Sequence, residues 1–258
     1  MSIQSLYDLS GKVAIVTGGG NGIGKACCGI LSEAGASVVV GDVNGADAET
    51  VAREITGKGG SAVAVSCNVM QDRELVNLVE SAVKTFGAVN ILVNNAGGGG
   101  GGRENPFRID RAYVEKIYAM NVFAAWRLCQ LAVPYMAESG YGSIVNITSM
   151  ASIDRSPDMS IYASSKAALN HMAANMAYDF GSMNVRINCV GPGATRTHAL
   201  ESVLTPELEE KMLRHTPLKR LGEVSDIAGA VLYFASPVSA WVSGQVLFVN
   251  GGGVQTLD

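Results

Sequence analysis

Short apolar segments alternate along the chain with longer segments in which apolar residues recur every three or four positions. The first of the short segments, Lys12–Thr17 (KVAIVT), contains a continuous apolar run, which is typical of a strand covered on both faces. Six later segments have the same character. The pattern therefore predicts seven strands, at Lys12–Thr17, Ser37–Asp42, Ala62–Ser66, Val89–Val93, Ser143–Thr148, Val185–Val190 and Gln245–Val249.

The segments between these strands have the period of an amphipathic helix. In Asp72–Phe86, for example, Leu75, Leu78 and Val79 fall on one helical face. Helices are predicted at Gly22–Ala34, Ala46–Gly57, Asp72–Phe86, Tyr113–Met136, Tyr162–Gly181 and Val224–Ala235, and Pro134 is expected to bend or stop the fourth of them. Repeated strand–helix–strand units predict an α/β fold, a doubly wound parallel sheet with helices on both faces.

No linker or change of composition divides the chain, so we expect a single domain over residues 1–258. Two segments are less regular than the rest. Gly97–Asp110 opens with six consecutive Gly, and Ala194–Gly222 contains two Pro and a short amphipathic helix near Leu208–Leu213. Long irregular segments in compact α/β domains are often lids over a site, and we expect the second one to form a substrate loop.

Composition narrows the class of protein. The chain is 48% hydrophobic and 16% charged with a formal net charge of −4, and this charge disfavours nucleic acid or an anionic membrane surface as partner. Five Cys without a C-x-x-C pair are expected to be buried free thiols. The three His lack metal-ligand spacing, so no metal site is expected. With neither a signal peptide nor an apolar run of about 18 residues, a cytoplasmic protein is expected.

The first candidate site lies between the first strand and the first helix, at Thr17–Gly24 (TGGGNGIG). Gly18 permits a tight turn, Gly22 lets the backbone approach a pyrophosphate, and Gly24 lets the helix pack closely on the sheet. The helix N-terminus then offers N–H groups and a partial positive charge to the phosphates. A Gly cluster also occurs in ordinary turns, and its place between a strand and a helix favours a dinucleotide site.

Asp42 ends the second strand, where a carboxylate can accept hydrogen bonds from the ribose hydroxyls of NAD and repels the 2′-phosphate of NADP. The alternative is a turn residue or a helix cap. No Lys or Arg lies within Gly18–Gly24, which also favours NAD, although Lys25 follows directly. Asn68–Val69 after the third strand and Asn94–Gly97 after the fourth could contact adenine and ribose from the same edge, or simply form turns.

Tyr162 and Lys166 lie four residues apart at the start of a predicted helix, and therefore on one face. Because a nearby cation stabilises a phenolate, we expect Lys166 to lower the pKa of Tyr162 below about 10 and to allow proton exchange with a substrate hydroxyl. Ser149, just after the fifth strand, could donate to the substrate oxygen, and Asn121 could hold a backbone kink or a water. Pro192–Thr195 could face a nicotinamide carboxamide. Each of these also has an ordinary alternative when taken singly. The pair Tyr162 and Lys166 could be an exposed helix face, and Ser149 a turn residue. Asn121 could be a buried amide, and Pro192–Thr195 a loop.

The order and spacing of these motifs resemble the short-chain dehydrogenases/reductases over nearly the whole chain. The matching stretches are Thr17–Gly24, Asp42, Asn94–Gly97, Asn121, Ser149, Tyr162, Lys166 and Pro192–Gly193. The resemblance implies a Rossmann-type fold, commonly a homotetramer, and a catalytic set of Asn121, Ser149, Tyr162 and Lys166. In that family the Tyr is the acid and base, the Ser positions the substrate, and the Lys lowers the pKa of the Tyr, binds the nicotinamide ribose and joins a proton relay.

Within the family, the chain is most similar to bacterial members that oxidise a hydroxyl group of bile acids with NAD. The similarity rests on NNAGGGG, ITSMAS, YASSKAA, the segment Leu204–Gly222 and the tail Trp241–Gln255. It implies substrate contacts at Gly99, Ser149, Asp154 and Tyr162. The implied cofactor contacts are Gly18, Asn21, Gly22, Ile23, Gly24, Asp42, Val43, Asn68, Val69, Asn95, Gly97, Tyr162, Lys166, Thr195, Arg196 and Thr197.

Some residues depart from the pattern. Asn68 replaces the usual Asp of the family, and Asp154 stands where this subgroup has an amide. The oxidised hydroxyl therefore stays open between 7α, the first expectation, and 12α. Arg103 or Arg108 could meet a bile-acid carboxylate, or lie on the surface. The remaining alternatives are a reductase of another carbonyl, such as a 3-oxoacyl thioester or a sugar, and a dinucleotide-binding regulator that has lost catalysis.

Overall fold

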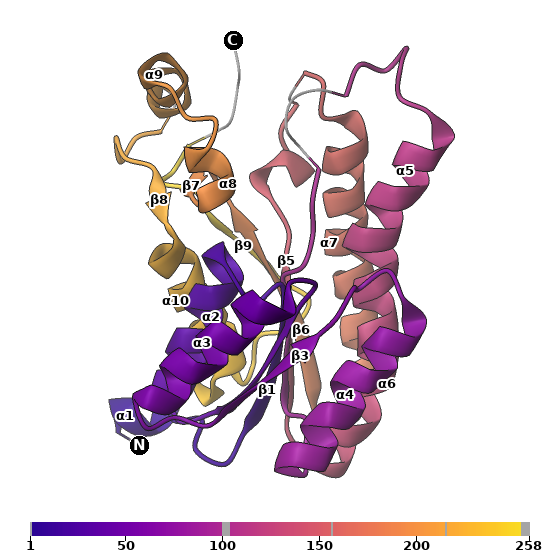
Figure 1. Ribbon diagram of the computed structural model, residues 1–258, viewed down its shortest axis with the longest axis vertical. Helices are drawn as coiled ribbons and strands as arrows, with labels where there is room; N and C mark the ends of the chain where they lie inside the picture. Colours follow the sequence, from indigo (N-terminus) through magenta and orange to yellow (C-terminus); the bar gives the residue numbers. More distant parts are fainter. Residues whose placement is uncertain (1, 100–103, 156, 215, 254–258) are drawn as a thin grey trace.

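The computed structural model describes residues 2–99, 104–155, 157–214 and 216–253. Its main element is a parallel sheet of seven strands in the order β3-β2-β1-β4-β5-β6-β9 (Figure 1), which confirms the predicted fold class. The strands are β1 Val13–Thr17, β2 Ser37–Asp42, β3 Ala62–Ser66, β4 Ile91–Asn94, β5 Gly142–Ile147, β6 Val185–Pro192 and β9 Val246–Val249. Their ends differ from the predicted ends by at most two residues.

Helices cover both faces of this sheet (Figure 1). On one face lie α2 (Gly22–Glu33), α3 (Gly45–Gly57) and α10 (Val224–Ala235), and on the other α4 (Asp72–Phe86), α6 (Ala124–Glu138) and α7 (Ser160–Gly181). Neighbouring residues of a strand enter opposite layers, so that Val16 packs with the first group of helices and Ile15 with the second. Burial on both sides explains why the strands have no alternating polar face.

The predicted helix Tyr113–Met136 consists of three elements. α5 (Arg111–Tyr118) runs into a π-helical turn, η1 (Ala119–Phe123), which continues as α6. The apolar period of the sequence gave no sign of this turn. Of the two outcomes expected for Pro134, a bend or a stop, the stop is wrong, since α6 continues to Glu138. Pro removes one backbone hydrogen bond there, and the burial of α6 side chains on both sides of it outweighs that loss.

The predicted substrate loop, Ala194–Gly222, contains several short elements. β7 (Thr195–Arg196) pairs in parallel with β8 (Gly222–Glu223), and α8 (His198–Glu201) and α9 (Pro206–Arg214) lie between them in the chain. Sequence analysis predicted only α9 among these. It also missed α1 (Ile3–Tyr7), η2 (Met150–Ser152) and η3 (Pro237–Ser239), which are too short to show a hydrophobic period.

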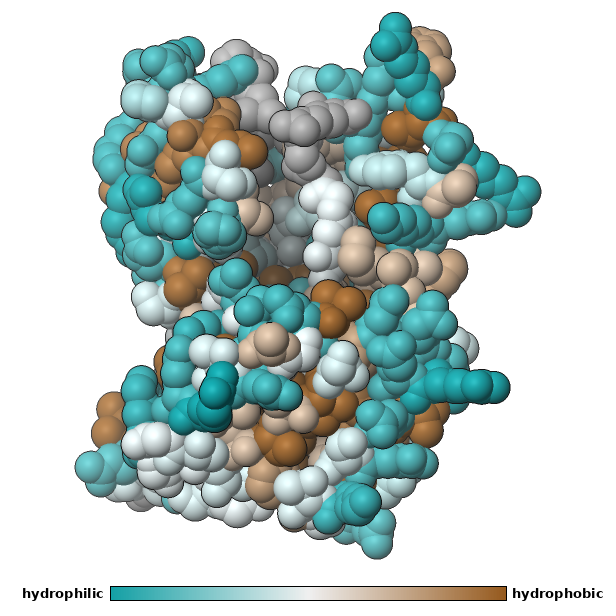
Figure 2. Space-filling model, in the orientation of Figure 1, coloured by the Kyte–Doolittle hydropathy of each residue, from teal (hydrophilic) through white to brown (hydrophobic). Residues whose placement is uncertain are grey.

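The order of strands reverses between β1 and β4, since the chain first builds outward to β3 and then returns to build outward to β9. Open parallel sheets bind ligands beside such a reversal, at the carboxyl ends of the strands. Figure 2 shows a recess in this face of the molecule, between the part that contains α8 and α9 and the part that contains α5. The candidate site is therefore expected along this edge.

All five Cys are free and buried, as predicted. Burial raises the pKa of four of the thiols, Cys27, Cys67, Cys129 and Cys189, to about 12. The reactive thiolate is therefore scarce near neutral pH. None of the helices described is long and apolar enough to span a bilayer.

Candidate active site

The turn between β1 and α2 has the geometry that its Gly residues suggest. Gly18 and Gly22 adopt φ values of +62° and +53°, a region that L side chains rarely enter. A Cβ on Gly24 would overlap the carbonyl oxygen of Gly18, so no larger residue fits where the helix crosses the turn. Asn21 caps α2, its Oδ1 accepting a hydrogen bond from Gly22 N at 2.6 Å. The first turn of α2 is thus a suitable place for an anion.

Asp42 is held beside this turn. Its Oδ2 accepts from Gly20 N and its Oδ1 from Asn44 N, both at 2.9 Å, which fixes the carboxylate while leaving lone pairs for ribose hydroxyls. The alternative role of a helix cap belongs to Asn44, whose side chain accepts from two N–H groups of α3. Lys25, the cation nearest to the turn in sequence, forms an ion pair of 2.8 Å with Glu54.

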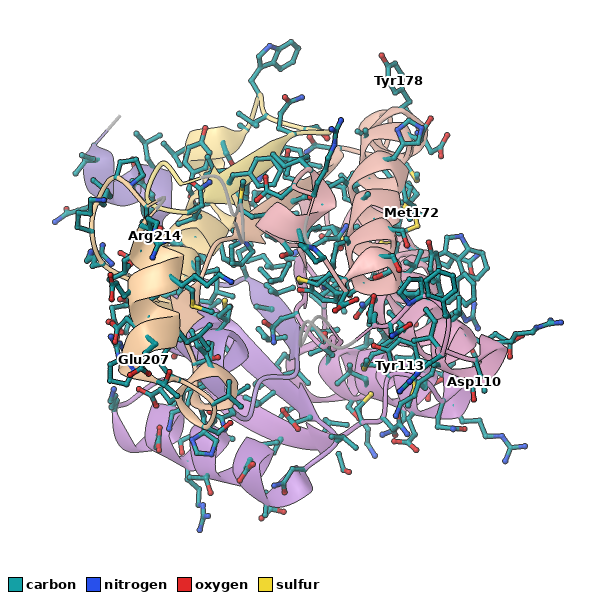
Figure 3. All side chains as sticks on the ribbon, turned by 90° about the horizontal axis from the view of Figure 1, so that it is seen from above. Asp110, Tyr113, Met172, Tyr178, Glu207 and Arg214 are labelled. Carbon is teal, nitrogen blue, oxygen red and sulfur yellow. The ribbon has the colours of Figure 1, made fainter. Side chains whose placement is uncertain are left out.

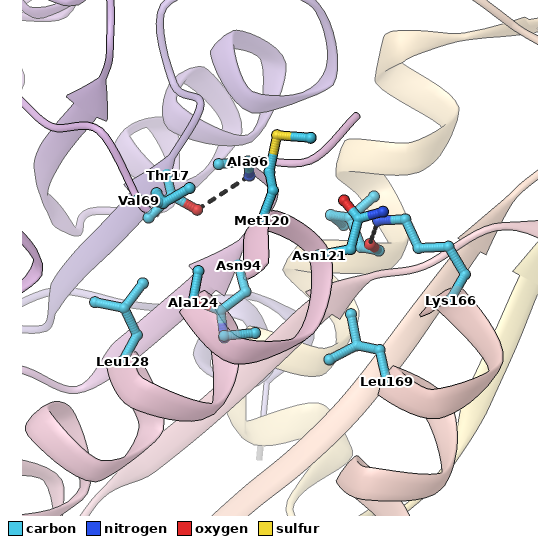
Figure 4. Close-up of a pocket in the computed structure, with 12 residues that line it drawn as sticks. Thr17, Val69, Asn94, Ala96, Met120, Asn121, Ala124, Leu128, Lys166 and Leu169 are labelled. Carbon is cyan, nitrogen blue, oxygen red and sulfur yellow. Dashed lines mark hydrogen bonds between the residues drawn. The ribbon is translucent and has the colours of Figure 1, made fainter. Parts of the chain in front are cut away.

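The other predicted cofactor residues of this half lie at the ends of neighbouring strands. Val43 follows β2 and is 70% exposed, and Asn68–Val69 follows β3. Asn95 has a structural task, because its Nδ2 donates to the carbonyl oxygens of Thr17 and Gly18 at 2.9 and 3.0 Å. The Thr17 hydroxyl in turn accepts from Ala96 N at 3.1 Å (Figure 4). These bonds join the ends of β1 and β4 beneath the Gly turn.

After β6, the predicted contacts Thr195, Arg196 and Thr197 form the entry to the substrate loop. Thr195 is buried in β7, and Thr197 caps α8. The Arg196 guanidinium lies 2.9 Å from Glu209 on α9 and 3.6 Å from Glu223 in β8. Its side chain therefore connects the loop elements to one another.

Lys166 and Tyr162 lie in the first two turns of α7. The Lys166 ammonium donates to the carbonyl oxygen of Ile147 at 2.9 Å and lies 5.8 Å from the centre of the Tyr162 ring. Only 4% of Lys166 is exposed, and this burial lowers the pKa of its ammonium to about 8. Figure 4 shows Lys166 and Asn121 side by side on the wall of a small pocket at the strand ends.

The pKa of Tyr162 moves in the direction opposite to the prediction. Burial raises the pKa of the phenol above its ordinary value, and a hydrogen bond from the Ser149 hydroxyl lowers it by less. The spacing of Tyr162 and Lys166 indicates the attraction of a nearby ammonium but not the cost of removing a phenolate from water, which depends on burial in the fold. The Lys166 ammonium is directed at the carbonyl of Ile147, and Ser149 is the group that favours the phenolate.

Asn121 lies in the π-helical turn and connects the end of β4 to α7. Its side chain accepts from Gly98 N and donates to Gly98 O, both at 3.0 Å, and donates to the Ser165 hydroxyl at 2.9 Å. Ser165 donates in turn to the carbonyl oxygen of Tyr162 at 2.7 Å. π-Helical turns are frequent at functional sites, where they redirect a side chain. Here the turn directs an amide at the backbone that passes Tyr162.

Two Gly residues let that backbone approach the side chains of Asn121, Lys166 and Tyr162. A Cβ on Gly97 would lie 2.9 Å from Asn121 Oδ1 and 3.1 Å from Lys166 Nζ. A Cβ on Gly99 would lie 3.3 Å from the Tyr162 ring. The structure thus brings together Asn121, Ser149, Tyr162 and Lys166 with Gly97 and Gly99, although these residues come from four separate segments.

Three residues of the prediction have a less defined place. Asp154 lies in the turn after η2, where its N–H donates to Met150 O at 3.1 Å. Arg108 is exposed, and Arg103 lies outside the described residues. The geometry therefore provides no argument for a bile-acid carboxylate at either arginine.

Sequence analysis missed two residues that support this site. Ser165, within the YASSK stretch, links Asn121 to α7. Glu104 is 2% exposed and accepts hydrogen bonds from Ile161 N and Tyr162 N. The sequence offered one sign that a distant residue caps α7. Met159, the residue before this helix, has no side chain able to cap it.

Comparisons with known proteins show which proteins this chain is similar to. Residues 18–253 match a family model described as enoyl-(acyl carrier protein) reductase. The chain is 50% identical over 250 residues to the 7α-hydroxysteroid dehydrogenase of Escherichia coli K12, covering 97% of each chain. It is 32% identical over 244 residues to the 3-oxoacyl-[acyl-carrier-protein] reductase FabG of Thermotoga maritima, covering 95% of this chain and 98% of that one.

A solved structure extends the likeness to three dimensions. It is a 7α-hydroxysteroid dehydrogenase complexed with NADH and 7-oxo glycochenodeoxycholic acid, with a TM-score of 0.95 and 48% identity over 100% of both chains. The likeness thus extends over the whole chain, including the segment Ala194–Gly222.

Proposed function

Because the chain belongs to the short-chain dehydrogenase/reductase family, we propose that it is an NAD-dependent dehydrogenase of the 7α-hydroxyl group of bile acids. The observation that carries the proposal is its 50% identity, over 97% of its length, to a 7α-hydroxysteroid dehydrogenase. The proposal is supported by the meeting of Ser149, Tyr162 and Lys166 at the carboxyl edge of the sheet.

In the proposed reaction, bound NAD accepts a hydride from the carbon that bears the hydroxyl group. Tyr162, once deprotonated, accepts the hydroxyl proton, and in the reverse direction it donates this proton to the ketone oxygen. Ser149 donates a hydrogen bond to the same substrate oxygen and favours the phenolate. Lys166, with its pKa lowered to about 8, is able to exchange a proton near neutral pH.

The residues present fit NAD. The Gly turn leaves room for a pyrophosphate at the N-terminus of α2. The Asp42 carboxylate, fixed by Gly20 N and Asn44 N, supplies acceptors for two ribose hydroxyls and repels a 2′-phosphate. The pairing of Lys25 with Glu54 removes a cation that would favour NADP. The substrate contact at Asp154 stays a prediction. So do the remaining cofactor contacts, which are Ile23, Val43, Asn68, Val69, Asn95, Gly97, Thr195, Arg196 and Thr197.

A panel of bile acids tests the substrate. Chenodeoxycholate has hydroxyls at 3α and 7α, deoxycholate at 3α and 12α, and cholate at all three positions. We expect NADH formation with chenodeoxycholate and cholate, little with deoxycholate, and a 7-oxo product by mass spectrometry. Turnover of deoxycholate to a 12-oxo product would assign a 12α-dehydrogenase instead, and a higher kcat/KM with NADP than with NAD would contradict the cofactor assignment.

The similarity to FabG keeps a second substrate class in the test, a 3-oxoacyl thioester reduced by NADPH or NADH. Turnover of acetoacetyl thioesters without turnover of any bile acid would favour it. A regulator without catalysis would bind NAD and turn over neither class. The intact Ser149, Tyr162 and Lys166 oppose this last alternative.

We further propose a homotetramer in the cytoplasm, as the resemblance implies. Support comes from two large aromatic side chains on the surface, Tyr178, 91% exposed, and Trp241, 101% exposed. Figure 3 shows Tyr178 pointing outward at the end of α7. The buried free thiols suit a reducing compartment. Size-exclusion chromatography with light scattering tests the assembly, and a monomer at micromolar concentration would contradict it.

A further inference from the structure

Glu104 is a buried carboxylate between β4 and α5, with 2% of its surface exposed. Its Oε2 accepts from Ile161 N at 2.7 Å, and its Oε1 accepts from Tyr162 N at 3.1 Å. A carboxylate is costly to bury unless its oxygens are hydrogen-bonded. Glu104 is therefore committed to the two backbone N–H groups that begin the helix of Tyr162.

The first turn of α7 needs such a partner. The helix begins at Ser160, and the residue before it, Met159, forms no side-chain cap. Ile161 and Tyr162 occupy the second and third helical positions, whose N–H groups are the usual targets of a capping side chain. Glu104 fills this role from a position 57 residues away from Ile161 in the chain.

Two more hydrogen bonds fix Glu104 itself. Tyr113 on α5 donates its hydroxyl proton to Glu104 Oε1 at 3.0 Å, and Glu104 N donates to the carbonyl oxygen of Asp158 at 2.9 Å. Figure 3 shows Tyr113 on the α5 side of the molecule, across from α9 with Glu207 and Arg214. Glu104 thus joins α5, the turn before α7 and the first turn of α7.

We infer that Glu104 is a positioning residue, which holds the first turn of α7 so that Tyr162 faces Ser149 and which opposes the phenolate form of Tyr162 by its charge. The inference rests on the proposed function, since it assumes that Tyr162 exchanges the substrate proton. Glu104 lies outside the sequence motifs from which the candidate site was predicted.

The effect of charge follows from what surrounds Tyr162. The N-terminal dipole of α7 favours the phenolate, and Ser149 donates a hydrogen bond to the Tyr162 hydroxyl. The Lys166 ammonium, on the same helix, is directed at the carbonyl oxygen of Ile147. The Glu104 carboxylate accepts from Tyr162 N and from the Tyr113 hydroxyl, and a negative charge so close to Tyr162 is expected to disfavour its phenolate. Removing the charge while keeping the shape should lower the pH at which alcohol oxidation reaches half its maximum.

The experiment compares Glu104→Gln and Glu104→Ala with a control, Glu115→Gln, on exposed α5 surface. A Gln oxygen can still accept from Ile161 N, while its amide can donate to the Tyr113 hydroxyl. We expect Glu104→Ala to lower kcat for chenodeoxycholate about 30-fold with the KM for NAD within twofold. We expect Glu104→Gln to keep kcat within about threefold and to shift the pH profile down by about half a unit. Glu115→Gln should change neither quantity.

Hydrogen exchange of the peptide 160–166 gives a readout that needs no substrate. We expect faster exchange in Glu104→Ala, and unchanged exchange in Glu104→Gln and in the control. Wild-type exchange and kcat in Glu104→Ala would overturn the positioning role, and an unshifted pH profile in Glu104→Gln would overturn the charge effect. If the wild-type protein oxidises no bile acid, the proposed function fails, and the exchange data still decide whether Glu104 holds the turn.

Discussion

Helices α2 and α7 both begin at the carboxyl edge of the sheet, and their first turns are completed in different ways. At α2 the capping oxygen comes from Asn21, one residue before the helix, and no acidic residue lies in the first turn. At α7 the oxygens come from Glu104, a buried carboxylate of a distant segment. The positive end of α2 therefore stays available to phosphates, while that of α7 is offset by a negative charge.

One edge of the sheet can therefore hold two kinds of site. A helix end without a carboxylate suits the anionic part of a dinucleotide. A helix end closed by a buried carboxylate excludes phosphate and holds the side chains of its first turn in fixed positions. Variants that disturb one helix end and leave the other unchanged test this division of tasks.

The largest expected effect comes from Tyr162→Phe on α7. Without its hydroxyl, the proton of the substrate has no acceptor, and kcat should fall about a thousandfold. The proposed contacts with the NAD phosphates and with Asp42 lie at α2, and Phe keeps the ring of Tyr162, so NAD affinity, measured by quenching of protein fluorescence, should stay within twofold. Retained turnover in this variant would show that Tyr162 is not the acid and base.

At α2, Gly24→Ala should damage the fold as well as NAD binding. The new Cβ would overlap the carbonyl oxygen of Gly18, and we expect a loss of about 3 kcal/mol in the free energy of unfolding. Gly29→Ala is the matched control in the same helix, because a Cβ there meets nothing within 4 Å. It should stabilise the protein by about 0.5–1 kcal/mol. Equal denaturation midpoints for the two variants would contradict the close packing at Gly24.

Lys166→Met should reveal the cost of burying an ammonium in the second turn of α7. The pKa of Lys166 is about 8 in the folded protein, below its ordinary value of 10.5, so the unfolded chain binds more protons between these two pH values. Stability from this group therefore rises with pH across that window. Below pH 8 the Met variant should be more stable than the wild type by about 3 kcal/mol, although inactive.

Urea denaturation of both proteins between pH 7 and 10.5 measures this difference. The buried Cys titrate in both proteins, so their contribution cancels when the two curves are subtracted. The advantage of the variant should shrink toward zero as the pH approaches 10.5. A difference that does not change with pH would contradict the lowered pKa of Lys166.

The smallest effect is expected from Asp42→Asn, which tests the proposed contact of Asp42 with the NAD ribose beside α2. The variant loses the charge, and its amide nitrogen would face an N–H donor of Gly20 or Asn44. We expect NAD affinity to fall about tenfold, equal to 1.4 kcal/mol, and NADP affinity to rise relative to it. Glu49→Gln, an exposed carboxylate on α3, is the control. An unchanged NAD to NADP ratio would contradict the role of Asp42.

The two helix ends also differ in how far the sequence predicts them. The α2 turn depends on residues next to each other in the chain, and both the role of Gly24 and the end of β2 at Asp42 followed from the pattern. The strands were predicted well because burial on both faces produces unbroken apolar runs.

The α7 end depends on partners that are distant in the chain. A lone Glu104 in an irregular segment has no local pattern, and its role follows only from where the fold places Ile161 and Tyr162. The pKa of Tyr162 was predicted in the wrong direction because burial is a property of the whole fold. The apolar period gave no sign of the π-helical turn at Asn121, because a single extra residue does not disturb it, and only the Asn side chain suggested a backbone kink there.

The buried thiols give the protein an internal probe of its own opening. Cys27 and Cys28 belong to the core on one face of the sheet, and Cys67, Cys129 and Cys189 to the core on the other. A thiol reagent reaches each group only when its layer separates from the strands. The order in which the five cysteines become labelled under mild denaturant would therefore tell which layer detaches first, without any engineered label.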